Sequence, residues 1–373
     1  MKSIGVLGGT RFIGYHLTRT LLESGHRVTL FHRGRTAGPG PLASPFVRHV
    51  YGDRDRPADL GEFLHERYDA VFDLSGYSPR HVRPLLDERL RSRIGHYIFC
   101  STSSVYAVPP PCPHTESAPR TTVAGTYGGD KALVEDLVMA EWGRSGWPVT
   151  ILRPQGVFGR FDATQAAFVF ARLVNSLPIL LGPRRRYRLS FAYVSDLVSA
   201  FVRAMSQPRA HGRIYDVAGD DVVTQTEFVE LCAAAASLRP EVRVLECEDD
   251  ARWPIGLPWP GYHLVADSSL VKRELDVEFT PLRRALEETW DWLRATPAHL
   301  QPHLFRGEEL LRENRPIRAW RRTLWRVEDV LRASAMTRPA VSRLGRLLRR
   351  VRTVARRQRA PAPCLGSPRP FNP

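Results

Sequence analysis

Lysine is scarce in this sequence, and long hydrophobic runs are absent from it. Of the 54 basic residues, only those at positions 2, 131 and 272 are lysine, and the other 51 are arginine. The most apolar later stretch, residues 166–181, contains Arg172 and Pro178 and is too short to span a bilayer. The apolar run at residues 3–7 leads directly into a glycine loop, which leaves no room for a cleavable signal peptide. We therefore expect a soluble, cytoplasmic protein.

Cysteine is also sparse. The five cysteines are scattered, odd in number and without a C-x-x-C pair. This pattern argues against a disulfide framework and against a zinc site, and it fits a reducing compartment. We predict no metal. The composition, 43% hydrophobic and 25% charged, further excludes a collagen-like or wholly disordered chain.

The charge is distributed unevenly along the chain. A formal net charge of +15 is typical of a nucleic-acid-binding protein. Residues 301–373, however, hold 18 Arg against 5 acidic residues, whereas residues 1–300 hold 36 basic and 34 acidic residues. The nearly neutral body therefore suits a small-molecule substrate, and nucleic acid is not expected as its partner.

The Arg-rich segment has apolar residues at helical spacing over residues 316–333 and 340–357. A basic amphipathic helix can pack on the body of its own chain, contact another protein or a second copy in a homodimer, or lie on an anionic membrane surface. Nucleic acid is the least favoured of the candidate partners. The sequence leaves these alternatives open.

Short β-branched runs alternate with helical patterns in the first half of the chain. We expect strands at residues 3–7, 27–31, 70–74, 97–100 and 149–152, and helices at 12–22, 80–92 and 129–143. Alternation of this kind predicts a parallel sheet covered by helices on both faces. After residue 154 we expect helices at 163–176 and 281–293 and a strand-to-helix pattern at 191–205.

A glycine loop lies between the first expected strand and the first expected helix. Its sequence is Gly8-Gly9-Thr10-Arg11-Phe12-Ile13-Gly14, with Arg11 where many such loops have a glycine. Glycines here let the backbone approach a pyrophosphate, and the helix N-terminus offers free N–H groups. We therefore predict that residues 8–14 bind a dinucleotide cofactor.

The end of the second strand bears on which dinucleotide binds. Folds that prefer NAD place an acidic residue there to hold the ribose hydroxyls. This chain instead has His32-Arg33-Gly34-Arg35, without an acid. Arg33 and Arg35, joined by Arg11, would pair with a 2′-phosphate that an acid would repel. The sequence favours NADP over NAD, the alternative being that these arginines are solvated loop residues.

One of the three lysines stands four residues after a tyrosine, in Tyr127-Gly-Gly-Asp-Lys131. On a helix this spacing puts both side chains on one face. A free phenol has a pKa of about 10, too high for proton transfer at neutral pH, and a nearby ammonium lowers that pKa. We predict that Tyr127 exchanges a proton with the substrate, while Lys131 lowers its pKa and holds a cofactor ribose.

Six motifs occur in order along residues 1–296. They are the loop at 8–14, Tyr-Gly-Asp-Arg-Asp at 51–55, Ile-Phe-Cys-Ser-Thr-Ser-Ser-Val-Tyr at 98–106, Tyr127-x-x-x-Lys131, Leu-Arg-Pro-Gln-Gly-Val-Phe-Gly at 152–159 and Phe-Ala-Tyr-Val-Ser-Asp-Leu at 191–197. Together they resemble the extended or atypical short-chain dehydrogenases/reductases, the NAD-dependent epimerase/dehydratase family. The loop variant is also similar to a subgroup of bacterial reductase-like proteins and to a plant chloroplast stem-loop RNA-binding branch.

The resemblance implies roles for individual residues. Thr102 matches the catalytic Ser or Thr of the family, and Tyr127 and Lys131 match its catalytic pair. Asp53 matches an acid near the adenine, and Ser75-Gly76 match the segment that runs beside the cofactor.

Sugar-nucleotide epimerases of this family often carry an arginine shortly before the Val-x-Asp motif. Arg188 is the nearest candidate, in a cluster with 184–186, and it either contacts a nucleotide-sugar substrate with Thr102 and Tyr127 or is a solvated loop residue. Other substrate contacts are expected in 155–190 and 248–265. We expect Asp196 of the motif to cap the helix that begins there.

The expected fold is α/β, with a Rossmann-type doubly wound parallel sheet. Residues 1–154, with about 189–205, should form the NAD(P)-binding domain, residues 155–297 a smaller substrate-binding part, and residues 298–373 an appended basic helical tail. The predicted activity is that of an NADP(H)-dependent oxidoreductase or epimerase acting on a carbinol or carbonyl of a small molecule. The alternative is a non-catalytic or RNA-binding protein that retains the same fold.

Overall fold

The computed structural model describes residues 1–35, 42, 44–162, 164–244 and 259–300. These residues belong to one compact unit, Met1–Gly307. The expected helices at 316–333 and 340–357 lie outside the described residues, as does the segment 248–258 of the expected substrate contacts.

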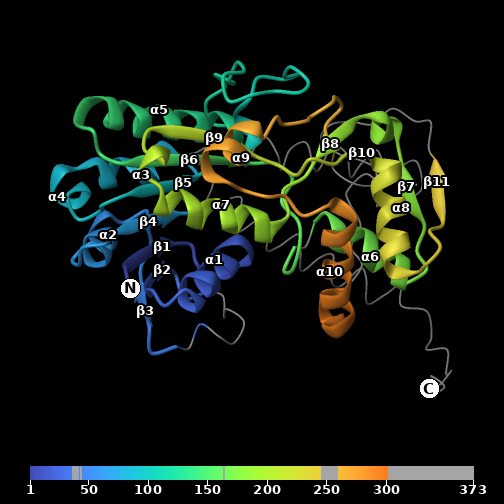
Figure 1. Cartoon of the computed structure of the whole chain (residues 1–373), viewed down its shortest axis with the longest axis horizontal. Coiled ribbons are helices and arrows are strands. Elements are labelled where there is room, and N and C mark those ends of the chain that lie inside the picture. The colour runs from blue at the N-terminus through green and yellow to red at the C-terminus, as the bar shows by residue number, and fades with distance from the viewer. Residues whose placement is uncertain (36–41, 43, 163, 245–258, 301–373) are drawn as a thin grey trace, which may run out of the picture. The chain divides into compact units, whose positions relative to one another are not determined.

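A seven-stranded parallel sheet forms the centre of this unit, in the order β3-β2-β1-β4-β5-β6-β9 (Figure 1). The strands are β1 (Ser3–Leu7), β2 (Arg27–His32), β3 (Val47–Tyr51), β4 (Ala70–Asp73), β5 (Tyr97–Cys100), β6 (Val149–Pro154) and β9 (Arg213–Val217). The chain runs outward from β1 to β3 and then returns to β4. The strand order therefore reverses between β1 and β4, and ligands of such sheets bind at the carboxyl ends beside this point.

Helices cover both faces of the sheet. On one face α1 (Phe12–Glu23), α7 (Val194–Ser206) and α9 (Ser269–Leu275) share a hydrophobic core with the strands. On the other face α2 (Pro57–Phe63), α3 (Pro79–Val82) and α5 (Tyr127–Ser145) do the same. Within the described residues, none of the helices is long and apolar enough to cross a membrane.

The chain beyond β6 builds a further hydrophobic core around Phe158, Phe191, Phe228 and Trp259. Its helices are α6 (Ala166–Val174), α8 (Gln225–Ala236) and α10 (Leu282–Ala295). Two small sheets complete it: β8 (Arg188–Ser190) pairs antiparallel with β10 (Val222–Thr224), and β7 (Ile179–Leu181) pairs parallel with β11 (Val242–Val244). Between β8 and β10 the chain returns to the central sheet as β9. The second half of the chain therefore contributes both to the central sheet and to this further core.

The fold class is confirmed, and three local expectations are wrong. The single helix at 80–92 is instead α3, a 3-10 turn (Arg83–Leu86) and α4 (Glu88–Arg91). The α-helix ends at Val82, two residues before Pro84, and Asp87 starts α4 by accepting a hydrogen bond from the Arg89 N–H at 3.0 Å. The strand expected at 191 lies at 188–190. Asp196 does not cap α7, because its carboxylate accepts hydrogen bonds from the backbone and hydroxyl of Thr280, at 2.9 and 2.8 Å.

Candidate active site

The glycine loop brings the start of α1 against the end of β1. Gly8 has a φ of +94°, and a Cβ on Gly14 would lie 2.2 Å from the Gly8 carbonyl oxygen. Position 14 therefore accepts no side chain without moving the loop. The Thr18 hydroxyl fixes the arrangement by bonding the carbonyls of Gly14 and Gly9, at 2.7 and 3.2 Å.

A cavity of about 700 Å³ opens beside this loop, at the carboxyl ends of the strands. This volume is typical of a small-molecule or cofactor site. Residues that follow four neighbouring strands line it: Gly8, Thr10, Arg11, Phe12, Ile13 and Gly14 after β1; Arg33, Gly34 and Arg35 after β2; Gly52, Asp53, Arg54 and Asp55 after β3; and Leu74, Ser75 and Tyr77 after β4. Of the predicted cofactor residues, Gly9, Gly76 and Lys131 are not among its lining residues.

Arginines dominate one side of the cavity. Arg11, Arg33 and Arg35 are exposed and form no ion pair within the described residues. At the end of β2 the cavity meets His32, where an NAD-preferring fold would present an acid. The surface is therefore suited to an anionic ligand.

A buried ion pair behind the cavity was not predicted from the sequence. Arg54, after β3, binds both carboxylate oxygens of Asp73 at 2.7 Å, and it also donates to the Ser75 hydroxyl and the His81 carbonyl, at 2.8 and 2.9 Å. Burial alone would raise the pKa of Asp73, but Arg54 and the Tyr97 hydroxyl hold it below its usual range. The pair thus fixes the segment at Ser75 and the start of α3. Arg54 belongs to the sequence motif at 51–55, but the motif alone did not indicate that Arg54 pairs with Asp73.

The predicted catalytic residues come from the end of β5 and the start of α5. Thr102 follows β5 and accepts a hydrogen bond from the Ser104 N–H at 3.2 Å. Tyr127 is the first residue of α5, and Lys131 lies one turn later. A Cβ on Gly128 would lie 1.9 Å from the Ser104 carbonyl oxygen, so glycine permits α5 to start directly against the turn after Thr102. The structure therefore brings the Thr102 turn and the Tyr127–Lys131 helix together.

Lys131 is 2% exposed, and its ammonium donates to the Cys100 carbonyl at 2.7 Å. It also lies 4.5 Å from the ring centre of Phe99 and 5.2 Å from that of Tyr77. Burial lowers the pKa of Lys131. Cys100, whose carbonyl accepts this hydrogen bond, lines the cavity, whereas Lys131 is not among the lining residues.

The expected lowering of the Tyr127 pKa is not found in this geometry. Desolvation, followed by the nearby Cys100 thiol, raises the pKa of Tyr127 to about 12, although the hydrogen-bonding Thr102 hydroxyl lowers it. The Lys131 ammonium is directed to the Cys100 carbonyl, which explains why it does not dominate the phenol.

Tyr77 is a further residue of the site that the sequence did not reveal. It lines the cavity, is 52% exposed, and its ring centre lies 6.5 Å from that of Tyr127. Its ring also faces the Lys131 ammonium, as described above. Tyr77 therefore lies between the cavity and the Tyr127–Lys131 pair.

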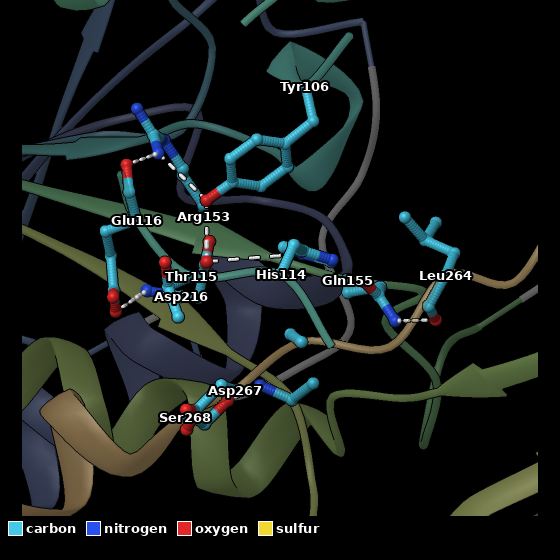
Figure 2. Close-up of polar contacts among 12 residues, drawn as sticks. Tyr106, His114, Thr115, Glu116, Arg153, Gln155, Asp216, Leu264, Asp267 and Ser268 are labelled. Atoms are coloured by element: carbon cyan, nitrogen blue, oxygen red, sulfur yellow. Dashed lines mark hydrogen bonds and ion pairs between the residues drawn. The ribbon is translucent and has the colours of Figure 1, made fainter. Parts of the chain in front are cut away.

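A buried polar network supports the catalytic elements from behind. Arg153, at the end of β6, donates to the Tyr106 hydroxyl at 2.9 Å and to the Glu116 carbonyl at 3.0 Å. The Tyr106 hydroxyl in turn donates to Asp216 at 2.6 Å, and Figure 2 shows the side chains of Arg153, Tyr106 and Asp216 meeting beside His114. Tyr106 ends the turn that Thr102 begins, so the network fixes that turn to β6 and β9.

The structure does not bring Arg188 to the site. It opens β8, is exposed, and is not among the residues lining the cavity. The buried neighbour Leu189 occupies the inward position of this short strand. From the expected substrate segment at 155–190, Phe161, Asp162 and Thr164 do line the cavity.

This sheet, its glycine loop and the Tyr-x-x-x-Lys helix define an enzyme of the short-chain dehydrogenase/reductase type. The sequence model of the NAD dependent epimerase/dehydratase family matches residues 4–218, more than half of the chain. The chain belongs to this family, whose cofactor is an NAD-type dinucleotide.

Named relatives and solved structures agree with this assignment. The chloroplast stem-loop binding protein of 41 kDa b from Arabidopsis thaliana is 30% identical over 255 residues, which cover 65% of each chain, slightly less than two thirds of the plant protein. Putative UDP-arabinose 4-epimerase 4 from Arabidopsis thaliana is 25% identical over 345 residues, covering 78% of this chain and 76% of the relative. A crystal structure of a UDP-glucose 4-epimerase superposes with a TM-score of 0.68 at 18% identity, covering 79% of this chain and 98% of that one. At this identity the structural match shows the fold.

Proposed function

We propose that the protein is an NADP(H)-dependent oxidoreductase or epimerase that acts on a carbinol or carbonyl group of a small molecule, with nucleotide sugars as the favoured class. The observation that carries the proposal is the single cavity that extends from Arg11, Arg33 and Arg35 to Cys100, the residue whose carbonyl binds Lys131. A dinucleotide suits this cavity because Gly8 and Gly14 of the loop line it at the N-terminus of α1 and the arginines offer positive charge to phosphates.

In the proposed reaction, the nicotinamide supplies or accepts a hydride at the substrate carbon when it is bound. Thr102 orients the substrate oxygen by a hydrogen bond, and Tyr127 transfers the proton at that oxygen. A free phenol already keeps its proton at pH 7, and desolvation raises the pKa of Tyr127 further, to about 12, so in this proposal Tyr127 is the proton donor for carbonyl reduction. To act as a base, Tyr127 needs an additional positive charge beside it. In this proposal Lys131 provides that charge and holds the ribose once its ammonium leaves the Cys100 carbonyl.

The cofactor preference has its own test. Arg11, Arg33 and Arg35 have no ion-pair partner among the residues that the structure describes, and the sequence has no acid at the end of β2; both observations support NADP over NAD. We expect the purified protein to bind NADPH with a lower Kd than NADH in fluorescence titrations. A lower Kd for NADH would overturn this part of the proposal.

The substrate class is supported by the names of relatives, among which UDP-arabinose 4-epimerases match 77–78% of this chain. The test is a panel of UDP- and dTDP-sugars, followed both by cofactor absorbance and by chromatography of the products. Net consumption of NADPH identifies a reductase, whereas interconversion of sugars without net consumption identifies an epimerase. Tyr127→Phe should abolish either activity while the Kd for NADPH stays within about twofold, and retained turnover would refute the role of Tyr127.

A second candidate function rests on the 30% identity with the chloroplast stem-loop binding protein. In this alternative the fold serves to bind RNA. A gel shift with the full chain, using an RNA hairpin and a single strand of the same composition, tests it. Hairpin binding that NADPH does not displace, together with no turnover on the sugar panel, would favour this alternative.

A further inference from the structure

Two histidines form an unbroken hydrogen-bonded chain beside the turn that carries Arg33 and Arg35. The Gly34 N–H donates to Nδ1 of His32 at 3.2 Å, and Nε2 of His32 lies 2.8 Å from Nδ1 of His49 on the neighbouring strand β3. Nε2 of His49 lies 3.3 Å from the Leu42 carbonyl oxygen. All four ring nitrogens of the pair therefore have a partner.

The two ends of this chain fix the position of every proton in it. The Gly34 N–H can only donate, so Nδ1 of His32 accepts and the ring carries its hydrogen on Nε2. That hydrogen is donated to Nδ1 of His49, which leaves the His49 hydrogen on Nε2, facing a carbonyl that can only accept. The chain is satisfied only when both rings are neutral and in this tautomer.

An added proton on His32 breaks the chain at its first bond. It puts an N–H on Nδ1, against the Gly34 N–H. Two donors cannot bond each other, so Gly34 loses its acceptor.

The turn itself depends on this anchor. Gly34 has a φ of +67°, and a Cβ there would lie 3.0 Å from the Tyr51 ring. The Tyr51 ring in turn packs on both histidines, with ring centres 5.0 Å from His32 and 6.1 Å from His49. Gly34 thus lies beside a three-ring surface, its backbone N–H is bonded to His32, and a charged arginine stands on each side of it.

We propose that the neutral His32–His49 pair is a positioning device for recognition of the cofactor 2′-phosphate: it fixes the Arg33–Arg35 turn, and protonation of His32 releases the turn and weakens the binding of NADPH. The inference rests on the proposed preference for NADP. It also opposes the simplest expectation, namely that a histidine beside a phosphate strengthens binding when it becomes a cation.

The groups around the pair favour the neutral form. Arg33 and Arg35 flank it on its own segment, β3 contributes Tyr51, and no acidic side chain of the described residues forms an ion pair with either ring. Burial and the neighbouring His49 lower the pKa of His32. His32 is therefore neutral at pH 7 and gains a proton below the usual histidine range.

The test compares three substitutions. His32→Asn keeps an acceptor for the N–H two residues later, as asparagine does in many turns, but does not titrate near neutrality. In His32→Leu, the leucine side chain is similar in size to histidine but has no hydrogen-bond acceptor. His65→Asn is the matched control, since His65 is exposed and does not line the cavity.

Kd values for NADPH and NADH are measured for each full-length protein at about pH 8 and about pH 5.5. At pH 8 we expect His32→Leu to bind NADPH about fivefold more weakly, as for one lost hydrogen bond, with the Kd for NADH within about twofold. We express the cofactor preference as the Kd for NADH divided by the Kd for NADPH. Between about pH 8 and about pH 5.5 this preference should fall further in the wild type and in His65→Asn than in His32→Asn. A 2′-phosphate itself titrates near pH 6, but this contribution is the same in all proteins.

Two other outcomes can be told apart. The positioning role is overturned if the preference for NADPH falls equally with pH in the wild type and in His32→Asn. It is also overturned if the preference of the wild type rises as the pH falls. Both outcomes leave the NADP proposal standing. A wild type that binds NADH at least as tightly as NADPH at pH 8 instead overturns the NADP proposal, and this inference with it.

Discussion

Arg153 and Glu135 form a fully buried two-point ion pair between the end of β6 and α5. The Arg153 guanidinium donates to the two carboxylate oxygens of Glu135 at 2.9 and 2.6 Å, and both side chains are at most 1% exposed. Glu135 lies one turn after Lys131 on the same helix. The pair therefore ties the helix of Tyr127 and Lys131 to the strand whose arginine also holds the turn after Thr102.

Glu135→Gln should destabilise the protein by about 3 kcal/mol, because it leaves the Arg153 charge buried without its partner. The neighbouring Asp136→Asn is the matched control, since Asp136 is 56% exposed and pairs with Arg120 at the surface. Asp136→Asn should lower the free energy of unfolding by less than about 1 kcal/mol. Urea unfolding of both variants makes the comparison, and equal losses would contradict the importance of the buried pair.

Gly128→Ala should lower turnover without a matching loss of cofactor binding. The added Cβ would lie 1.9 Å from the Ser104 carbonyl oxygen, so the start of α5 must move away from the Thr102 turn. A displacement of about 1 Å at reacting groups can reduce the rate by about 100-fold. Gly143→Ala is the control in the same helix, because its Cβ meets nothing within 4 Å. It should keep the kcat and gain up to about 1 kcal/mol of stability. Equal kcat values for the two variants would show that the approach of α5 to the turn is not needed.

Much of the fold could be predicted because short apolar runs of sequence identify buried parallel strands without any knowledge of distant contacts. Runs such as 3–7 and 97–100 are apolar throughout, as strands covered on both faces must be. The loop at 8–14 could be placed between such a strand and a helix without knowing any distant contact. The carboxyl-end location of the cavity then follows from the topology alone.

The residues that were missed depend on pairings between distant segments. β3 is an edge strand of mixed polarity, so it has no clear apolar run, and the His32–His49 pair exists only once β3 is placed beside β2. Arg54 reaches Asp73 across 19 positions of sequence, and no local spacing indicates this contact. The role predicted for Arg188 rested on its place before the Val-x-Asp motif, which does not determine where the side chain points; in the structure Arg188 is exposed at the start of β8.

Tyr77 should matter for turnover through its ring and not through its hydroxyl. The ring covers the Lys131 ammonium at 5.2 Å and lies 6.5 Å from the Tyr127 ring. Tyr77→Phe preserves this surface, so its kcat should stay within about twofold of the wild type. Tyr77→Ala exposes the ammonium to water and should reduce kcat by about tenfold, roughly the value of one cation–π contact near a buried charge. Steady-state kinetics on the substrate found in the sugar panel decides the point, and equal losses in both variants would instead assign the role to the hydroxyl.

Asp216 gives the protein a stability that declines with rising pH. Burial raises the pKa of its carboxyl to about 8, whereas the usual value for aspartate is about 4. A folded-state pKa above the unfolded-state value means that the folded protein holds the proton more tightly. The contribution is therefore complete below about pH 4 and is lost as the pH rises to about 8.

Asp216→Asn should remove this decline, since the amide oxygen can still accept the hydrogen bond from the Tyr106 hydroxyl and no charge develops in the network of Figure 2. The Tm of the variant, relative to wild type, should rise between about pH 6 and about pH 8.5. His114, whose Nε2 lies 4.0 Å from the carboxylate, does not obscure the result, because burial lowers its pKa to about 4 and it stays neutral over this range. Asp220→Asn, at an exposed pair with Lys272, is the control and should show no such trend. A variant that is less stable than wild type by a larger margin at pH 8.5 than at pH 6 would mean that Asp216 is ionised and held by Arg153, contrary to the assignment.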